Sequence, residues 1–360
     1  MPPARRPFLS NKPHRNRQFQ PKAPVKVKEP ERVASIYDSI QDGNEYGSIV
    51  SLLPRDGLDL FDDFVKGLSV IEGLRGRPCL GYVANVVKNP AGSGIDATDD
   101  LPFLEMVSKV PAGVAEVDFY LVTNGGSAQQ VSRFVNALRQ RFEKVHFLLP
   151  SFCMSAGTLF ALSGDSIWMS ARACLGPIDP QVPSKDGRFV PAQALLLLVK
   201  ELQQQGDKAI AAGQGVPWSA VRIIDSMDKK ELGDAITASQ YSMMLATQFL
   251  LNYKFKTWTH HLKAGAPVTP DEKQATAEFV ADALASHDRW KAHGHSIARE
   301  VLWQEVRLLI DHPGPDLEKA MIKLWALCYY LFDKTAGLKA MVSQQYRYAR
   351  NAAQPKAATS

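Results

Sequence analysis

Two short turns contain the residues whose types and spacing could carry out chemistry. In the first, Gly125 and Gly126 directly follow an apolar stretch and precede a helical pattern. A turn without Cβ atoms can adopt positive φ and present backbone N–H groups to a substrate oxygen, although paired glycines also form plain tight turns. In the second, Ser155 lies where a strand pattern changes to a helical pattern. A serine at that position either exposes its hydroxyl as a nucleophile or caps the helix.

The nucleophile interpretation of Ser155 implies acyl transfer. The next residues, Ala156 and Gly157, are small enough for the backbone to approach a substrate carbonyl. The free N–H groups at the start of a helix stabilise a developing negative charge on that carbonyl. Cys153 is a competing nucleophile, but its neighbours in the sequence imply no base, and a buried, unreactive thiol is the favoured interpretation.

A serine nucleophile also needs a neighbouring base, usually a histidine or a desolvated lysine. Asp179 and His293 are the candidates for base or orienting group. Each has a structural alternative, because Asp179 could stabilise a Gly-Pro turn and His293 could belong to an ordinary loop. Lys185 and Lys200 are further candidates, but neither lies on a recognised motif, and Lys200 is expected at a solvated helix position.

The elements around these turns predict a parallel sheet. Near-continuous apolar strands are expected at 117–122, 145–149 and 166–169, and each of the first two is followed by a turn and a helix. Such crossovers are right-handed and place the turns at the carboxyl ends of the strands, where ligands usually bind. A further strand is expected at 79–87, and helices are expected at 58–68, 99–110, 192–205, 232–253, 271–285 and 317–332.

The order of the motifs resembles the Clp-protease/crotonase superfamily, and most closely the serine dehydrogenase proteinase family, relatives of signal peptide peptidase A. The family's pro-gly-gly, met-ser-gly-gly-thr-leu, leu-gly-pro-val-asp-pro-gln and his-gly-tyr-pro-ile motifs correspond to 124–126, 154–159, 175–181 and 293–297. The resemblance runs from about Leu58 to Leu309. Three departures, Asn124, Ala156 and Ser296, leave the serine and its N–H donors in place.

This resemblance implies a fold and a set of roles. The fold is α/β, a Clp-protease/crotonase-like superhelix of ββα units with a helical C-terminal extension. Ser155 would be the nucleophile of a serine endopeptidase, Gly125, Gly126 and Ala156 would form the oxyanion hole, and Asp179 or His293 would assist. The implied partners are a protein or peptide substrate and further copies of the chain in a trimer or hexamer, without cofactor or metal.

Composition divides the 360-residue chain into unequal parts. Residues 1–32 contain nine Lys or Arg and two Glu, a net charge of +7, whereas the remainder has 33 basic and 35 acidic side chains. We therefore expect a disordered basic tail at 1–32, a core at 33–230, a helical region for the fold and oligomer contacts at 231–340, and a flexible tail at 341–360. Nucleic-acid binding is not expected of the near-neutral core, and only the tail has the charge for it.

No apolar run reaches the length of a membrane span, and the N-terminus lacks the pattern of a secretory signal. With four cysteines in no paired or metal-binding spacing, a cytoplasmic location is expected. Two alternatives to a peptidase stay open. The chain could be a catalytically weak or inactive scaffold that lost its base, or it could use its N–H donors in acyl-thioester chemistry.

Overall fold

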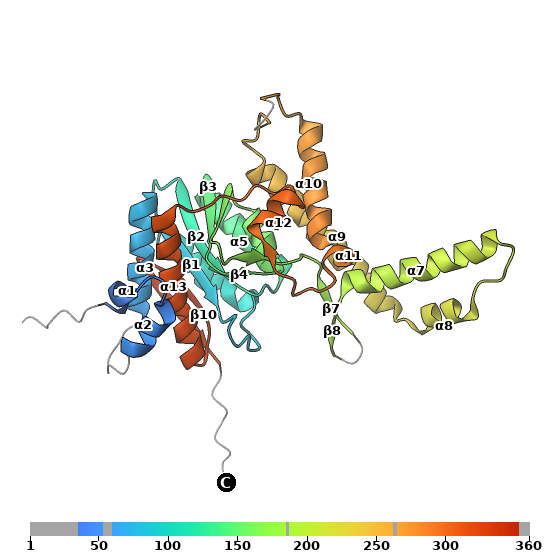
Figure 1. Cartoon of the computed structure of the whole chain (residues 1–360), viewed down its shortest axis with the longest axis horizontal. Coiled ribbons are helices and arrows are strands. Elements are labelled where there is room, and N and C mark those ends of the chain that lie inside the picture. Colours follow the sequence, from blue (N-terminus) through green and yellow to red (C-terminus); the bar gives the residue numbers. More distant parts are fainter. Residues whose placement is uncertain (1–34, 53–59, 185–186, 262–264, 353–360) are drawn as a thin grey trace, which may run out of the picture. The chain divides into compact units, whose positions relative to one another are not determined.

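A six-stranded mixed sheet forms the centre of the fold (Figure 1). The computed structural model describes residues 35–52, 60–184, 187–261 and 265–352. Four strands run parallel, β10 is antiparallel to β1, and β11 is antiparallel to β10. Across the sheet the strands are β11 (Tyr346–Asn351), β10 (Gly337–Ser343), β1 (Cys79–Ala84), β2 (Glu116–Val122), β3 (Lys144–Leu149) and β5 (Ser166–Met169).

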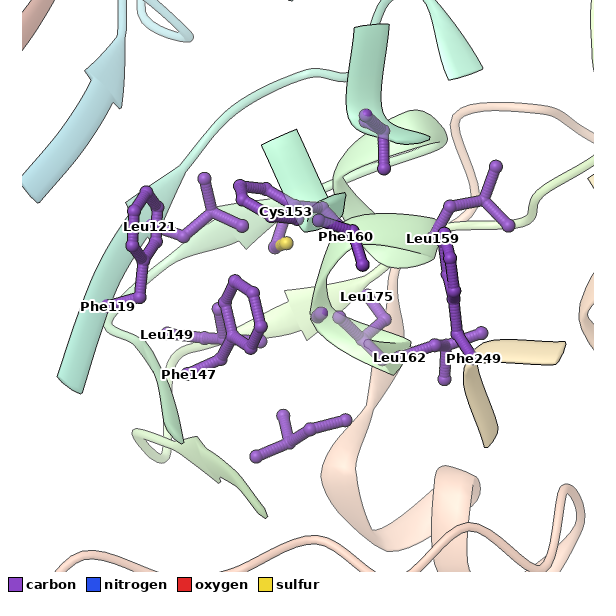
Figure 2. Close-up of a cluster of buried hydrophobic side chains, with 14 of the residues drawn as sticks. Phe119, Leu121, Phe147, Leu149, Cys153, Leu159, Phe160, Leu162, Leu175 and Phe249 are labelled. Atoms are coloured by element: carbon purple, nitrogen blue, oxygen red, sulfur yellow. The ribbon is translucent and has the colours of Figure 1, made fainter. Parts of the chain in front are cut away.

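The sheet is covered on both faces, as the apolar strands predict. Successive side chains of β2 point to opposite faces, so Phe119 and Leu121 join one hydrophobic cluster while Tyr120 and Val122 join the other. In the first cluster the Phe160 ring lies 4.9 Å from the Phe147 ring, centroid to centroid (Figure 2). Packing of this kind supplies most of the free energy that orders the elements around the site.

Helices from both ends of the chain build these two layers. The cluster on the Tyr120 side includes α1 (Ile36–Ser39), α2 (Glu45–Leu52), α3 (Leu60–Arg75) and α13 (Pro315–Lys334). The cluster on the Phe119 side includes α4 (Asp100–Ser108), α5 (Ala128–Arg141), α6 (Ala156–Leu162), α9 (Lys229–Phe249), α10 (Pro270–Ala285), α11 (His287–Trp290) and α12 (Arg299–Gln304). Helices α7 (Ala192–Ala211) and α8 (Trp218–Ser226) follow each other in sequence and contact each other.

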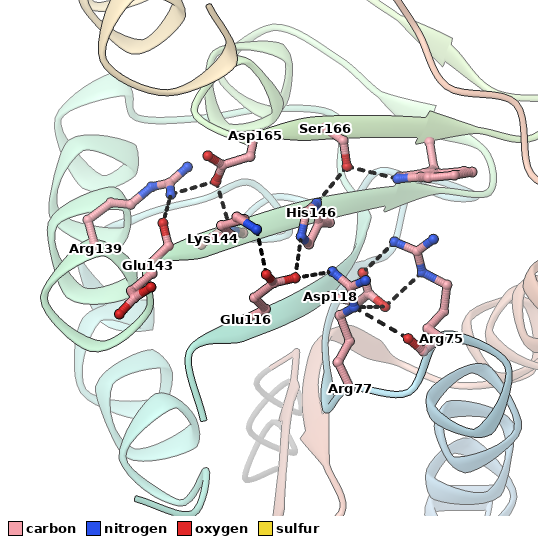
Figure 3. A network of polar contacts seen from close by, with 12 residues as sticks. Arg75, Arg77, Glu116, Asp118, Arg139, Glu143, Lys144, His146, Asp165 and Ser166 are labelled. Atoms are coloured by element: carbon pink, nitrogen blue, oxygen red, sulfur yellow. Dashed lines mark hydrogen bonds and ion pairs between the residues drawn. The ribbon is translucent and has the colours of Figure 1, made fainter. Parts of the chain in front are cut away.

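Ion pairs and hydrogen bonds join the amino ends of the central strands (Figure 3). Arg75 donates to Asp118 at 3.0 Å, and Arg139 donates to Asp165 at 2.7 Å. The pKa of His146 in β3 is lowered, chiefly because its ring is desolvated by burial. Polar groups therefore occupy the amino ends of these strands. The two turns predicted to carry chemistry lie at the opposite, carboxyl ends.

The predicted α/β class and the parallel strands are confirmed, but the flexible tail predicted for the C-terminal residues is wrong in part. Residues 341–360 were expected to form a flexible tail, but 341–343 belong to β10 and 346–351 to β11. All seven residues of β10 are buried, because the strand pairs with β1 and packs under α13. The basic tail expected at 1–32 lies outside the described residues. Within the described ranges, no helix is long and apolar enough to span a membrane.

Candidate active site

A small second sheet brings three separate segments to one place. It consists of β4 (Phe152–Cys153), β6 (Cys174–Leu175) and β9 (Ile297–Ala298), with β6 parallel to β4 and antiparallel to β9. Ser155 follows β4 by two residues, Asp179 follows β6 by four, and His293 precedes β9 by four. Given these strand directions, all three side chains emerge at the same end of the small sheet.

Ser155 has an unusual backbone conformation. Its φ of 52° and ψ of −120° lie in a region that residues with a Cβ rarely adopt. The side chain makes no capping hydrogen bond to α6, so the alternative that Ser155 caps this helix is wrong. A serine on a strained turn between strand and helix is the arrangement that exposes a nucleophilic hydroxyl.

The paired glycines pack directly against this turn. A Cβ on Gly125 would lie 2.6 Å from the Ser155 Cβ and 2.8 Å from the Met154 carbonyl oxygen. A Cβ on Gly126 would lie 2.3 Å from the carbonyl oxygen of Ile95. Both positions have positive φ, 104° and 139°, so close approach and backbone conformation together require glycine.

Gly126 and Ala156 are better placed as oxyanion donors than Gly125. The N–H of Gly125 donates to the Thr123 hydroxyl at 3.1 Å, and its carbonyl accepts from Ile95 at 2.8 Å. The N–H groups of Gly126 and Ala156 have no hydrogen-bond partner among the described residues, and both residues line the same cavity as Ser155. Of the three residues expected at the oxyanion hole, Gly125 therefore packs the turn, and the other two keep free donors.

Asp179 and His293 contact each other through their side chains, whereas the sequence indicated them only as two separate candidates. The Asp179 carboxylate is fully buried, and one of its oxygens lies 2.8 Å from His293 Nδ1. When Nδ1 donates this hydrogen bond, Nε2 of the same ring is left with its lone pair and can accept a proton. The alternatives that Asp179 only stabilises a turn and that His293 is an ordinary loop residue do not account for this pair.

His287 is a neighbour of Asp179 that the sequence did not indicate. Its Nδ1 lies 3.5 Å from the second Asp179 oxygen, and neither atom has a hydrogen-bond partner within the described part of the chain. His287 is the first residue of α11 and His293 follows the helix, six residues further on, without a recognisable spacing signal. Only the folded chain places both rings around one carboxylate.

Ser155 and His293 line one cavity of about 920 Å³. Its other walls come from α9, including Asp234 and Tyr241, and from the hairpin of β7 (Gln181–Pro183) and β8 (Phe189–Pro191). No hydrogen bond joins Ser155 to His293 in the described structure, and the two residues share the cavity lining. The cavity is large enough for several residues of an extended peptide.

The other candidate groups do not take part. Cys153 is fully buried, and burial raises the pKa of its thiol well above the ordinary value, so the thiolate is suppressed. Lys200 is exposed on α7 and is not among the residues that line the cavity. Lys185 lies outside the described residues. Across the described ranges, no group of three or more His, Cys, Asp or Glu is arranged to hold a metal ion.

A buried lysine on β10 positions the loop behind Gly126. Lys339 Nζ donates to the Gly94 carbonyl at 2.7 Å and pairs with Asp99 at 2.8 Å, and its side chain is fully buried. Burial raises the pKa of Asp99, an effect that the Lys339 ammonium opposes. Ile95 lies in this loop and forms the hydrogen bonds to the turn at 125–127. The sequence indicated neither the role of Lys339 nor that of Ile95.

Comparison with known proteins agrees with the motif resemblance. Residues 94–213, about a third of the chain, match the family described as ClpP-like SDH-type serine proteinase, which confirms the resemblance over that segment. Two uncharacterized proteins of Methanocaldococcus jannaschii are also similar. One is 36% identical over 94 residues, covering 26% of this chain and 30% of the relative, and the other is 26% identical over 144 residues, covering 40% and 46%. The chain thus spans less than half the length of the curated relatives it matches.

Solved structures give weaker likenesses. A membrane-bound stomatin-specific protease in complex with a substrate peptide is 15% identical, covering 67% of this chain and 94% of that chain, with a TM-score of 0.26. A probable enoyl-CoA hydratase/isomerase from Mycobacterium abscessus is 15% identical, covering 48% and 90%, with a TM-score of 0.23. Scores this low carry no argument about the present chain.

Proposed function

We propose that the chain is a serine peptidase that uses Ser155 as nucleophile, His293 as general base and Asp179 as the group that orients the base. The observation that carries the proposal is the strained, uncapped Ser155 on a cavity that it shares with a histidine bonded to a buried carboxylate. This is the combination of nucleophile, base and orienting acid that acyl transfer requires.

The mechanism follows from the positions of these groups. His293 Nε2 accepts the Ser155 proton as Oγ attacks the peptide carbonyl, and Asp179 stabilises the resulting imidazolium through Nδ1. The N–H groups of Gly126 and Ala156 hold the oxyanion of the tetrahedral intermediate. His293 then returns the proton to the leaving amine, the peptide C–N bond breaks, and water hydrolyses the acyl-enzyme by the same steps.

The two alternative functions are less well supported. The scaffold hypothesis was motivated by a missing base, and the His293–Asp179 pair supplies a candidate for that base. Acyl-thioester chemistry would use the two N–H donors but has no need of a strained serine. The expected homo-oligomer and cytoplasmic location stay predictions.

Labelling with a serine-directed fluorophosphonate tests the proposal. We expect Ser155→Ala to abolish labelling, and Asp179→Asn and His293→Gln to slow it by about a thousandfold or more, because each removes the activation of Oγ. Ser127→Ala is the matched control, because Ser127 is a second serine of the same cavity that instead caps α5. Labelling that persists in Ser155→Ala and disappears in Ser127→Ala would overturn the assignment.

His295→Gln is the control for the base. His295 is two residues from His293 but stacks on the Trp290 ring, 5.2 Å between centroids, and does not line the cavity. We expect its labelling rate to match that of the unmodified chain. Cleavage of a peptide library by the full chain, lost in Ser155→Ala, would establish peptide bonds as the substrate; turnover of a coenzyme A ester instead would favour the thioester alternative.

A further inference from the structure

A second cavity lies at the opposite edge of the main sheet from Ser155. Its volume is about 680 Å³, within the range of pockets for small molecules. Asp165 and Ser166, at the amino end of β5, form part of its wall, whereas Ser155 follows the carboxyl end of β3 (Figure 3 shows the edge with Asp165 and Ser166). Among the described residues, the two cavities share none of their lining.

Lys254 presents an incompletely satisfied ammonium to this cavity. It ends a π-helical turn, Leu250–Lys254, a rare conformation that is frequent at functional sites. Its side chain is only 6% exposed, and its nearest acidic atom, Asp311 Oδ2, is 3.6 Å away, beyond hydrogen-bond distance. In the described part of the chain no group other than Asp311 pairs with Nζ, and Lys254 is one of the residues that line the cavity. Burial lowers the pKa of the Lys254 ammonium, an effect that Asp311 opposes, so a second anion beside Nζ would favour its charged form.

Arg307 contributes a second positive charge under backbone strain. Its φ is 61°, a conformation that non-glycine residues adopt mainly where the surrounding structure requires it. The guanidinium lies over the Phe279 ring, 4.6 Å from its centroid, and pairs with no carboxylate in the described ranges. The strained backbone therefore holds at the cavity a guanidinium that stacks on Phe279 and pairs with none of the described carboxylates.

The acidic residues of the cavity do not neutralise both cations. Asp165 already accepts from Arg139 at 2.7 Å and from the Val145 N–H at 2.9 Å. Among the described residues that line the cavity, Asp311 is then the one carboxylate left to balance the charges of Lys254 and Arg307. The lining has two cationic and two acidic residues, and because Arg139 already pairs with Asp165, one cation of the lining is left without a carboxylate of its own.

Two tryptophans add apolar walls to the same space. Trp258 and Trp303 both line the cavity, and the Trp258 ring packs against Phe255, 5.4 Å between centroids. Indole rings next to cations suit a ligand that has an aromatic or aliphatic apolar part and one anionic group.

We propose that this cavity binds a small amphipathic carboxylate, with its anionic group on Lys254 and Arg307 and its aromatic or short acyl body against Trp258 and Trp303. The carboxylate of such a ligand accepts hydrogen bonds from Lys254 Nζ. The apolar part of the ligand covers indole surface that otherwise faces water. The site stands apart from the proposed catalysis, because it shares no lining residue with the Ser155 cavity among those described.

Isothermal titration of the full chain with phenylbutyrate tests the proposal, and phenylbutanol is the matched neutral probe. We expect the carboxylate to bind about tenfold or more tightly than the alcohol, because only the carboxylate can accept charge-assisted hydrogen bonds. Lys254→Met should remove this preference, and Lys256→Met, an exposed lysine two residues further on, should leave it unchanged. Equal affinity for the two probes, or no binding of either, would overturn the proposal.

Arg307→Gly provides a second variant that keeps the fold, because glycine adopts a φ of 61° without strain. We expect it to weaken phenylbutyrate binding by about tenfold and phenylbutanol binding little. Unchanged phenylbutyrate binding in both Arg307→Gly and Lys254→Met would exclude this site. Titration of Ser155→Ala separates the two proposals, since its affinity should equal that of the unmodified chain whether or not Ser155 is a nucleophile.

Discussion

Replacing Ser155 by glycine should make the protein more stable than replacing it by alanine. Both substitutions remove the hydroxyl, but alanine keeps a Cβ at φ 52° and ψ −120°, whereas glycine adopts this conformation freely. The comparison of the two variants therefore isolates the backbone strain at the proposed nucleophile.

The expected magnitude is a difference between two terms. Holding a residue with a Cβ in such a sparsely populated region costs about 1–3 kcal/mol. Glycine itself lowers the free energy of unfolding by about 0.5–1 kcal/mol relative to alanine, because the unfolded chain has more conformational freedom at a glycine. We therefore expect the free energy of unfolding of Ser155→Gly to exceed that of Ser155→Ala by about 1 kcal/mol.

Equilibrium unfolding in urea measures this difference from the shift of the transition midpoint at constant slope. Ser163, at the other end of α6, is the matched control, since its φ is −79° and the same pair of substitutions there should favour alanine. If Ser155→Gly is no more stable than Ser155→Ala, the strain does not exist and the conformational argument for a nucleophile fails.

Three further substitutions test the structure around the site. Gly126→Ala should lower the free energy of unfolding by about 4 kcal/mol, because its Cβ would lie 2.3 Å from the Ile95 oxygen at a φ of 139°; a loss below about 1 kcal/mol in a urea titration would contradict this geometry. Lys339→Met should cost about 3–5 kcal/mol and slow fluorophosphonate labelling, because it leaves the Asp99 carboxyl buried without its cation; an unchanged labelling rate would show that the loop does not depend on this pair. Burial lowers the pKa of His146, so as pH falls below about 6.5 the unfolded chain binds a proton at this residue before the folded chain does. The free energy of unfolding should therefore decline from about pH 6.5 down to the pKa of His146 in the folded chain. Unfolding titrations of His146→Gln should show a shallower decline, and an identical pH profile would exclude His146 as the cause.

The candidate nucleophile could be predicted from the sequence because its signals are local. Apolar strands at 117–122 and 145–149 change within a few residues to glycine-paired and serine-bearing turns, and parallel strands place such turns at one edge. Motif spacing then suggested the same family that the comparison finds over residues 94–213.

The pairing of the proposed base with its carboxylate could be found only in the tertiary structure. Asp179 and His293 are 114 residues apart, and they meet because two-residue strands, β6 and β9, pair in a small sheet. Strands this short have no periodicity to detect, so the sequence could not exclude a purely structural role for either residue. His287 reaches Asp179 through the same pairing and gave no signal at all.

The C-terminal segment shows the same limit in another way. Residues rich in Gln, Ala and Arg after 340 indicated fraying, yet 341–351 complete the main sheet, because β1 offers an edge on which β10 can pair. Lys339 belongs to a residue type that is rarely buried, yet it is buried where Asp99 and the Gly94 carbonyl satisfy its ammonium. Local residue patterns thus determined the strands, the turns and the candidate nucleophile, since these depend on neighbours in sequence. The partner of that nucleophile, the free N–H groups beside it and the lysine behind its loop depend on contacts between distant segments, which only the folded chain brings together.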